Sequence, residues 1–92
     1  MKHMVMYSIR PGCRPEAISR FLKTQGAPPP GVTLLGRWHK TDHSGGFSLY
    51  ESDNPAALFE AGAMWADVLE THDSVVVEDA EAGAILAKLH GK

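Results

Sequence analysis

The chain has 92 residues, of which 43% are hydrophobic and 22% charged, and its formal net charge is −2. This composition predicts one folded domain over residues 1–92 and argues against an intrinsically disordered chain. No run of about five basic residues is present, so electrostatic binding of nucleic acid is not expected.

The sequence carries no sign of export or of membrane insertion. Residues 1–6 lack the long apolar run and the small-residue cleavage site of a signal peptide. No stretch of about eighteen apolar residues occurs, so a transmembrane helix is not expected. The single cysteine, Cys13, excludes an intramolecular disulfide and a cysteine zinc cluster. We therefore expect a soluble, cytoplasmic protein without a membrane partner.

The first part of the chain predicts a strand, a helix and a stiff connector. Residues 2–9 place apolar side chains on both faces of a strand, which is typical of a strand covered on both sides. Pro15 suits the first turn of a helix, and Gly26 is a plausible C-cap. The three prolines within residues 27–31 then favour an extended connector.

The middle of the chain predicts a β-hairpin. Residues 32–41 and 47–52 are the two expected strands. Between them, residues 42–46 are rich in side chains that tolerate positive φ. We interpret the Gly45-Gly46 pair as part of this turn.

The last third predicts a helix, a strand and a short final helix. A second helix is expected to begin near Pro55 and to carry one apolar stripe, formed by Leu58, Ala61, Gly62, Trp65, Val68 and Leu69. Because glycine costs about 1 kcal/mol relative to alanine in a helix, we expect Gly62 to approach a neighbouring strand closely. Residues 71–78 are the fourth expected strand. Asp79 can cap a final helix whose apolar stripe is Ala82, Ile85, Leu86 and Leu89.

This order of elements predicts an α+β fold, a ferredoxin-like βαββαβ antiparallel sheet with a short extra C-terminal helix. The first two helices would cover one face of the sheet. The other face would need a second copy of the chain, and we expect a homodimer with its sheets paired face to face. The alternative is that the final helix folds over the sheet of its own chain.

Three segments resemble a known family. Residues 34–39 (Leu-Leu-Gly-Arg-Trp-His), 45–51 and 65–67 are similar to domain-of-unknown-function family 3303, a family of small bacterial proteins. The opening Met-Val-Met-Tyr-Ser-Ile and the Pro-Pro-Pro-Gly-Val stretch extend the resemblance over nearly the whole chain. It implies a dimeric α/β-barrel, ferredoxin-like fold, but it implies no activity and no catalytic residues.

Arg37, Trp38 and His39 are the first candidates for binding a ligand. Strand alternation sends Trp38 to one face of the sheet and its two neighbours to the other. If Trp38 packs under the helices, Arg37 and His39 point into a cavity between the sheets, where they could hold an anionic or polar ligand. If the faces are reversed, Trp38 lines that cavity and could stack on a planar ligand. The plainest interpretation of Trp38 is a core residue.

Tyr7, Tyr50 and His72 complete the candidate set, because each lies on or beside a predicted strand and could contribute a polar group to such a cavity. His72 does not lie in the sequence context of haem-degrading enzymes of this fold. We expect no cofactor.

A metal site is not expected. His39, Asp42 and His43 gather near the hairpin, but no regular spacing aims them at one ion, so we interpret the segment as a solvated turn.

Three functions are compatible with these features. The leading hypothesis is a homodimer that binds a small molecule in a cavity beside the sheet. The second is a cofactor-free monooxygenase or isomerase in which His39, Tyr50 or His72 transfers protons. The third is a ligand-free structural or interaction module, with Phe59 and Met64 in an exposed patch.

Overall fold

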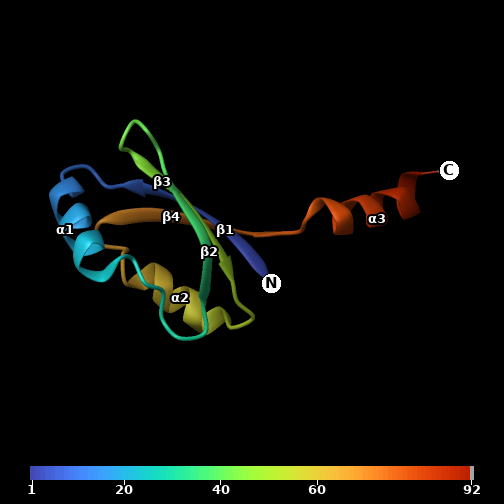
Figure 1. Ribbon diagram of the computed structural model, residues 1–92, viewed down its shortest axis with the longest axis horizontal. Helices are drawn as coiled ribbons and strands as arrows, with labels where there is room; N and C mark the ends of the chain where they lie inside the picture. Colours follow the sequence, from blue (N-terminus) through green and yellow to red (C-terminus); the bar gives the residue numbers. More distant parts are fainter. Residues whose placement is uncertain (92) are drawn as a thin grey trace.

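The computed structural model describes residues 1–91 and contains one four-stranded sheet (Figure 1). Its strands are Lys2–Ile9 (β1), Thr33–His39 (β2), Gly45–Glu51 (β3) and Leu69–Val76 (β4). The strand order is β2-β3-β1-β4, and every neighbouring pair is antiparallel. This is the βαββαβ arrangement of the ferredoxin-like fold, so the predicted fold class is confirmed.

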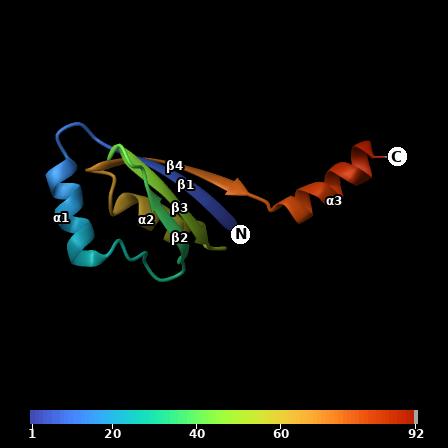
Figure 2. The same ribbon diagram turned by 45° about the horizontal axis from the view of Figure 1, so that its top comes forward.

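Two helices, Arg14–Thr24 (α1) and Pro55–Ala63 (α2), lie on the same face of the sheet (Figure 1). The third helix, Asp79–His90 (α3), continues from the end of β4 and projects away from the sheet (Figure 2). We call the face opposite α1 and α2 the open face. Nowhere in residues 1–91 does a helix have the length and hydropathy of a membrane span.

The helix starts follow the capping signals in the sequence. Pro15 lies in the first turn of α1, where its missing N–H costs nothing. Asn54 caps α2 because its side-chain oxygen accepts a hydrogen bond from the Ala57 N–H at 3.2 Å. At the end of α1 the left-handed cap is Gln25, with φ of 58°, and Gly26 follows it with φ of 63°.

The second helix is shorter than predicted. It ends at Ala63, and the chain then turns until Leu69 begins β4. Side chains from other elements bind the carbonyl groups of this turn: Arg20 binds that of Met64 at 3.0 Å, and Arg10 that of Ala66 at 2.9 Å. These side chains donate hydrogen bonds to carbonyl groups that have no helical partner beyond Ala63. The chain can therefore leave the helix here without losing hydrogen bonds at these groups.

Gly45 and Gly46 lie inside β3, not in the turn that the sequence predicted. The register places Tyr7 of β1 opposite Gly46. A Cβ atom on Gly46 would overlap the Trp38 carbonyl oxygen and would lie 2.5 Å from the Tyr7 hydroxyl. Glycine is therefore needed here because the Trp38 carbonyl oxygen and the Tyr7 ring occupy the space of a side chain, and not because of turn geometry.

The Gly62 prediction is also wrong. The nearest atom to an added Cβ is Thr71 Oγ1 at 3.9 Å, an ordinary contact distance. No close approach of a strand requires glycine at this position. Gly62 instead lies beside a cavity, described below.

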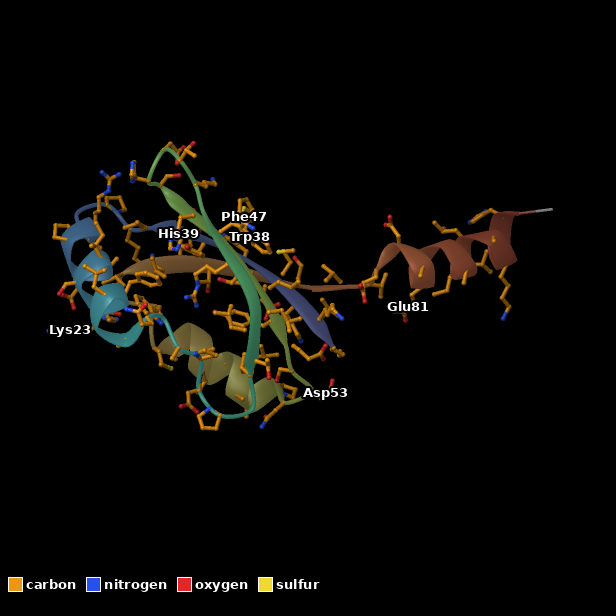
Figure 3. All side chains as sticks on the ribbon, viewed as in Figure 1. Lys23, Trp38, His39, Phe47, Asp53 and Glu81 are labelled. Carbon is orange, nitrogen blue, oxygen red and sulfur yellow. The ribbon has the colours of Figure 1, made fainter. Side chains whose placement is uncertain are left out.

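The single chain has a small core and a large uncovered surface. The buried apolar side chains are Ala17, Val32, Ala57 and Val68. On the open face, cross-strand pairing places Phe47 between Met6 and Trp38, and Figure 3 shows Phe47 beside Trp38. Trp38 is 55% exposed, so its interpretation as a core residue is wrong for the single chain.

The final helix does not cover its own sheet, in contrast to the alternative that the sequence left open. Within residues 79–90 no side chain is buried. The apolar stripe is exposed, with Leu86 at 56% and Leu89 at 67%. Only Val77 and Glu78 separate α3 from β4, which leaves little chain for a reversal of direction.

Candidate binding cavity beneath the helices

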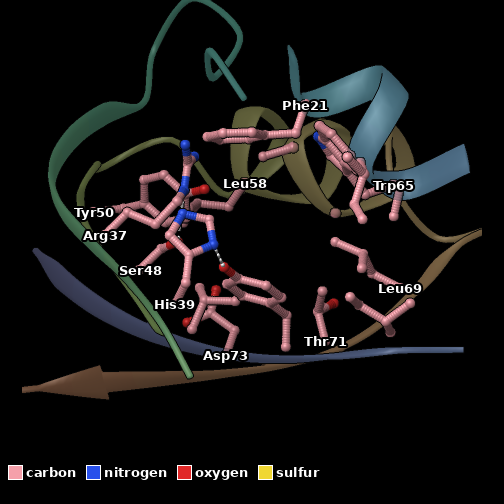
Figure 4. A pocket seen from close by; sticks show the side chains of 17 residues that line it. Phe21, Arg37, His39, Ser48, Tyr50, Leu58, Trp65, Leu69, Thr71 and Asp73 are labelled. Carbon is pink, nitrogen blue, oxygen red and sulfur yellow. Dashed lines mark hydrogen bonds between the residues drawn. The ribbon is translucent and has the colours of Figure 1, made fainter. Parts of the chain in front are cut away.

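A cavity of about 210 Å³ lies between the sheet and the two helices α1 and α2 (Figure 4). All four strands and both helices contribute to it. Its apolar lining residues include Val5, Ile9, Ile18, Phe21, Leu58, Trp65 and Leu69. Its polar lining residues are Tyr7, Arg37, His39, Ser48, Tyr50, Thr71 and Asp73. Apolar walls with a few polar groups are the usual composition of a small-molecule site.

Strand alternation explains which residues reach this cavity. Every second side chain of a strand points to the same face, so Val5, Tyr7 and Ile9 of β1 all face the helices. The same periodicity brings Arg37 and His39 of β2 into the cavity and sends Trp38 to the open face. The sequence therefore predicted which neighbours share a face, and the structure shows that the shared face lies beneath the helices.

Tyr7 and His39 form a polar pair on the cavity wall. The Tyr7 hydroxyl lies 3.3 Å from His39 Nδ1, within hydrogen-bond distance. The Phe21 ring meets the imidazole edge-on at a centroid distance of 5.3 Å. Burial raises the pKa of Tyr7 above 10.0, with smaller opposing and supporting effects from Arg37 and Tyr50. Tyr7 is therefore a neutral hydrogen-bonding group near neutral pH.

Arg37 is held by the chain itself. Its guanidinium donates to the Gln25 carbonyl at 3.1 Å, the Gly26 carbonyl at 2.7 Å, and the buried Ser48 hydroxyl at 3.3 Å. These carbonyl groups lie at the C-terminal end of α1, where a positive charge is favourable. Three of its five N–H groups are thus already used, which makes Arg37 a brace between β2 and α1.

Arg20 of α1 clamps the turn after α2 beside Trp65, which lines the cavity. Two of its nitrogens bind the two Asp67 oxygens at 2.9 and 2.8 Å. The guanidinium also lies 5.4 Å from the centroid of the Trp65 ring. The hydrogen bonds from Arg20 hold the pKa of Asp67 below its usual value. The sequence analysis did not identify this clamp, because Arg20 and Asp67 are 47 residues apart.

His3 and Asp73 form a second pair that the sequence analysis missed. His3 is only 6% exposed, and its Nδ1 lies 3.0 Å from Asp73 Oδ1. The alternation of side chains along β1 could have indicated the position of His3, since His3 shares its face of the sheet with Val5 and Tyr7. Asp73 lines the cavity and also a second, neighbouring pocket beside α2, whose lining includes the exposed Phe59.

The sequence candidates divide between the two faces of the sheet. Tyr7, Arg37, His39 and Tyr50 line the cavity. Trp38 and His72 do not: His72 lies on the open face, opposite Met6, and its Nε2 is 3.2 Å from Glu70 Oε1. A role in ligand binding stays a prediction for the four cavity residues.

The hairpin turn uses Asp42 as a structural acceptor. Its carboxylate accepts hydrogen bonds from the Ser44 hydroxyl at 2.7 Å and the Ser44 N–H at 3.0 Å. These bonds lower the pKa of Asp42. His43 occupies the left-handed region with φ of 66°. His39, in contrast, faces Tyr7, so the three polar residues near the hairpin serve different contacts.

Comparison with protein families identifies the family of this chain. The model of the family described as Domain of unknown function (DUF3303) matches residues 1–90. The chain belongs to this family. No curated protein and no solved structure gives a significant match. A function for this DUF3303 chain therefore has to be argued from its own cavity.

Proposed function

We propose that this DUF3303 domain binds a small organic molecule in the cavity between its sheet and helices α1 and α2. The observation that carries the proposal is the cavity itself, with its apolar walls and its Tyr7–His39 pair. Arg37 and Arg20 support it because Arg37 joins β2 to the end of α1 and Arg20 joins α1 to the turn after α2. A cavity held open in this way is largely formed before the ligand arrives.

The substitution Gly62→Leu tests this proposal by filling the cavity. An added Cβ at Gly62 meets no atom closer than Thr71 Oγ1 at 3.9 Å, so a larger side chain has room to enter. Leucine also favours a helix by about 1 kcal/mol relative to glycine. We expect the wild type to bind toluene in isothermal titration calorimetry and the variant to lose at least about tenfold in affinity, a loss of about 1.4 kcal/mol.

The matched control is Gly83→Leu in α3, where an added Cβ would meet nothing within 4 Å. This control should bind toluene like the wild type, and both variants should melt at or above the wild-type temperature. Toluene binding that survives Gly62→Leu would rule out the cavity as the site. A wild type that binds no toluene would also contradict the proposal.

Acid–base catalysis is the second candidate, favoured by the Tyr7–His39 pair alone. The two groups lie within hydrogen-bond distance on a largely apolar wall, an arrangement that suits proton transfer to a bound molecule. Mass spectrometry of a bound compound after incubation separates the two functions. A binding protein returns the compound unchanged, whereas a cofactor-free monooxygenase or isomerase returns a product.

We also propose that the functional unit is a homodimer. Two apolar surfaces of the single chain lack a cover: the open face, with Trp38 and Met6 at 55% and 43% exposure, and the α3 stripe. The short connector, residues 77–78, keeps α3 away from the sheet of its own chain. A symmetric partner covers both surfaces at once, since each copy supplies the same two.

A further inference from the structure

The Tyr7 hydroxyl can accept a hydrogen bond from a ligand or donate one to it, depending on where the proton of the Tyr7–His39 pair lies. If Tyr7 donates to Nδ1 of His39, the Tyr7 oxygen can still accept. If Nδ1 carries the proton and donates to Tyr7, the Tyr7 hydroxyl can donate. Burial raises the pKa of Tyr7 and so keeps its proton available. A ligand hydroxyl, itself a donor and an acceptor, satisfies both arrangements.

The charged groups of the cavity wall favour a neutral ligand. Arg37 and Asp73 are the charged side chains among the lining residues, and they have opposite signs. Each already has a partner inside the chain, the α1 carbonyl groups for Arg37 and His3 for Asp73. An anionic ligand would lose its hydration beside the Asp73 carboxylate and would compete with the α1 carbonyl groups for Arg37, which is unfavourable in an apolar site.

The size and the walls of the cavity favour a single aromatic ring. An apolar cavity of about 150 Å³ is known to admit benzene, so 210 Å³ leaves room for one ring and a small substituent. Phe21 and Trp65 face the sheet from the helix side (Figure 4). Aromatic side chains at these positions can contact a ring by its edge or its face.

We propose that the cavity takes a neutral one-ring phenol, whose ring packs between the helices and the sheet and whose hydroxyl binds the Tyr7 oxygen, while His39 holds Tyr7 through Nδ1. This inference rests on the proposed function. It favours a hydroxyl over a carbonyl, because a carbonyl cannot donate to the Tyr7 oxygen when Tyr7 itself donates to His39. It favours a phenol over a carboxylate, because Arg37 is already hydrogen-bonded within the chain and Asp73 would repel a second carboxylate.

Three probes that share a methylphenyl body test the inference: toluene, 4-methylphenol and 4-methylbenzoate. The variant Tyr7→Phe/His39→Leu removes the polar pair and keeps the apolar wall. We expect it to lose about tenfold in affinity for 4-methylphenol, since the buried ligand hydroxyl loses its partner, and to bind toluene like the wild type. The wild type should bind 4-methylbenzoate at least about tenfold more weakly than 4-methylphenol.

The controls separate this inference from the proposed function. Tyr7→Phe alone keeps the ring and guards against misfolding of the double variant, and it should weaken 4-methylphenol only. His90→Leu removes an imidazole at the exposed end of α3 and should change no affinity. If the double variant keeps its affinity for 4-methylphenol, or if 4-methylbenzoate binds most tightly, the phenol inference is overturned while toluene binding upholds the cavity. If neither toluene nor 4-methylphenol binds the wild type, both proposals are overturned.

Discussion

Gly46 shows how one residue positions the polar pair of the cavity. The Tyr7 ring crosses β3 at this glycine, and its hydroxyl thereby reaches Nδ1 of His39 on the next strand. Any side chain at Gly46 would occupy the space of the Trp38 carbonyl and of the Tyr7 ring. The Tyr7–His39 pair thus depends on the absence of a Cβ atom at a neighbouring position.

The substitution Gly46→Ala should displace Tyr7 and destabilise the fold. Overpacking of this kind costs about 1–3 kcal/mol, measurable by urea denaturation.

The raised pKa of Tyr7 provides a second measurement, because the neutral form of Tyr7 is favoured in the folded chain. The contribution of Tyr7 to the free energy of unfolding is therefore fully present below the ordinary pKa of 10.0 and is lost as the pH rises through the raised value. In the variant, ultraviolet titration should show the Tyr7 pKa moving back toward 10.0. Gly83→Ala, in open space on α3, should leave both measurements unchanged or raise stability slightly. An unaltered Tyr7 titration in Gly46→Ala would contradict this role.

At the residue scale, the sequence predicted which neighbouring side chains share a face of the sheet, but not which face lies beneath the helices. Alternation alone showed that Arg37 and His39 share a face that excludes Trp38. It could not show which face lies beneath the helices, because Met4 and Met6 make the other face of β1 as apolar as that of Val5. The His3–Asp73 and Arg20–Asp67 pairs join distant segments, so no local pattern predicts which residue each one pairs with.

At the scale of elements, the turn after α2 depends on α1. Arg20 binds the Met64 carbonyl and both Asp67 oxygens, and it lies over the Trp65 ring. The helical periodicity of the sequence correctly indicated that Trp65 and Val68 face inward, but not that the chain leaves the helix at Ala63. The strand at residues 2–9 was predicted with its observed limits because Pro11 and Gly12 mark its end.

The Arg20–Asp67 pair predicts a pH dependence of stability. The hydrogen bonds from Arg20 lower the pKa of Asp67 in the folded chain. Its contribution is therefore fully present above the ordinary carboxyl pKa of 3.8 and is lost as the pH falls through the lowered value. Asp67→Asn should reduce the melting temperature at pH 7 and flatten its decline below pH 3.8.

Glu81→Gln on the projecting helix is the control, since it removes a carboxylate at a distance from the clamp. It should leave the melting temperature at pH 7 close to that of the wild type. Equal acid sensitivity of Asp67→Asn and the wild type in differential scanning calorimetry would show that the clamp does not stabilise the fold.

At the scale of the whole molecule, the single chain is elongated. Its principal extents are 54 × 30 × 17 Å, and α3 accounts for the projecting end (Figure 2). The sequence indicated the need for a cover on the open face, because both faces of β1 are apolar. It could not indicate the direction of α3, which depends on the two residues that join it to β4.

The proposed dimer predicts that charges on either uncovered surface shift the chain to a monomer. Trp38→Glu on the open face and Leu86→Lys on the α3 stripe should each do so in sedimentation equilibrium. Ala84→Lys, on the opposite side of α3, should leave the wild-type dimer intact. A wild type that sediments as a monomer would contradict the dimer and leave the cavity proposal standing.

Occupation of the cavity is tested most directly by a methyl NMR titration of the wild type with 4-methylphenol. The methyl groups of Val5, Leu58 and Leu69 line the cavity, whereas those of Leu86 lie on α3 outside it. We predict that the first three shift progressively with ligand, that Leu86 does not, and that the shifts disappear in Gly62→Leu. Shifts that avoid Val5, Leu58 and Leu69, or that persist unchanged in Gly62→Leu, would contradict binding between the sheet and the helices.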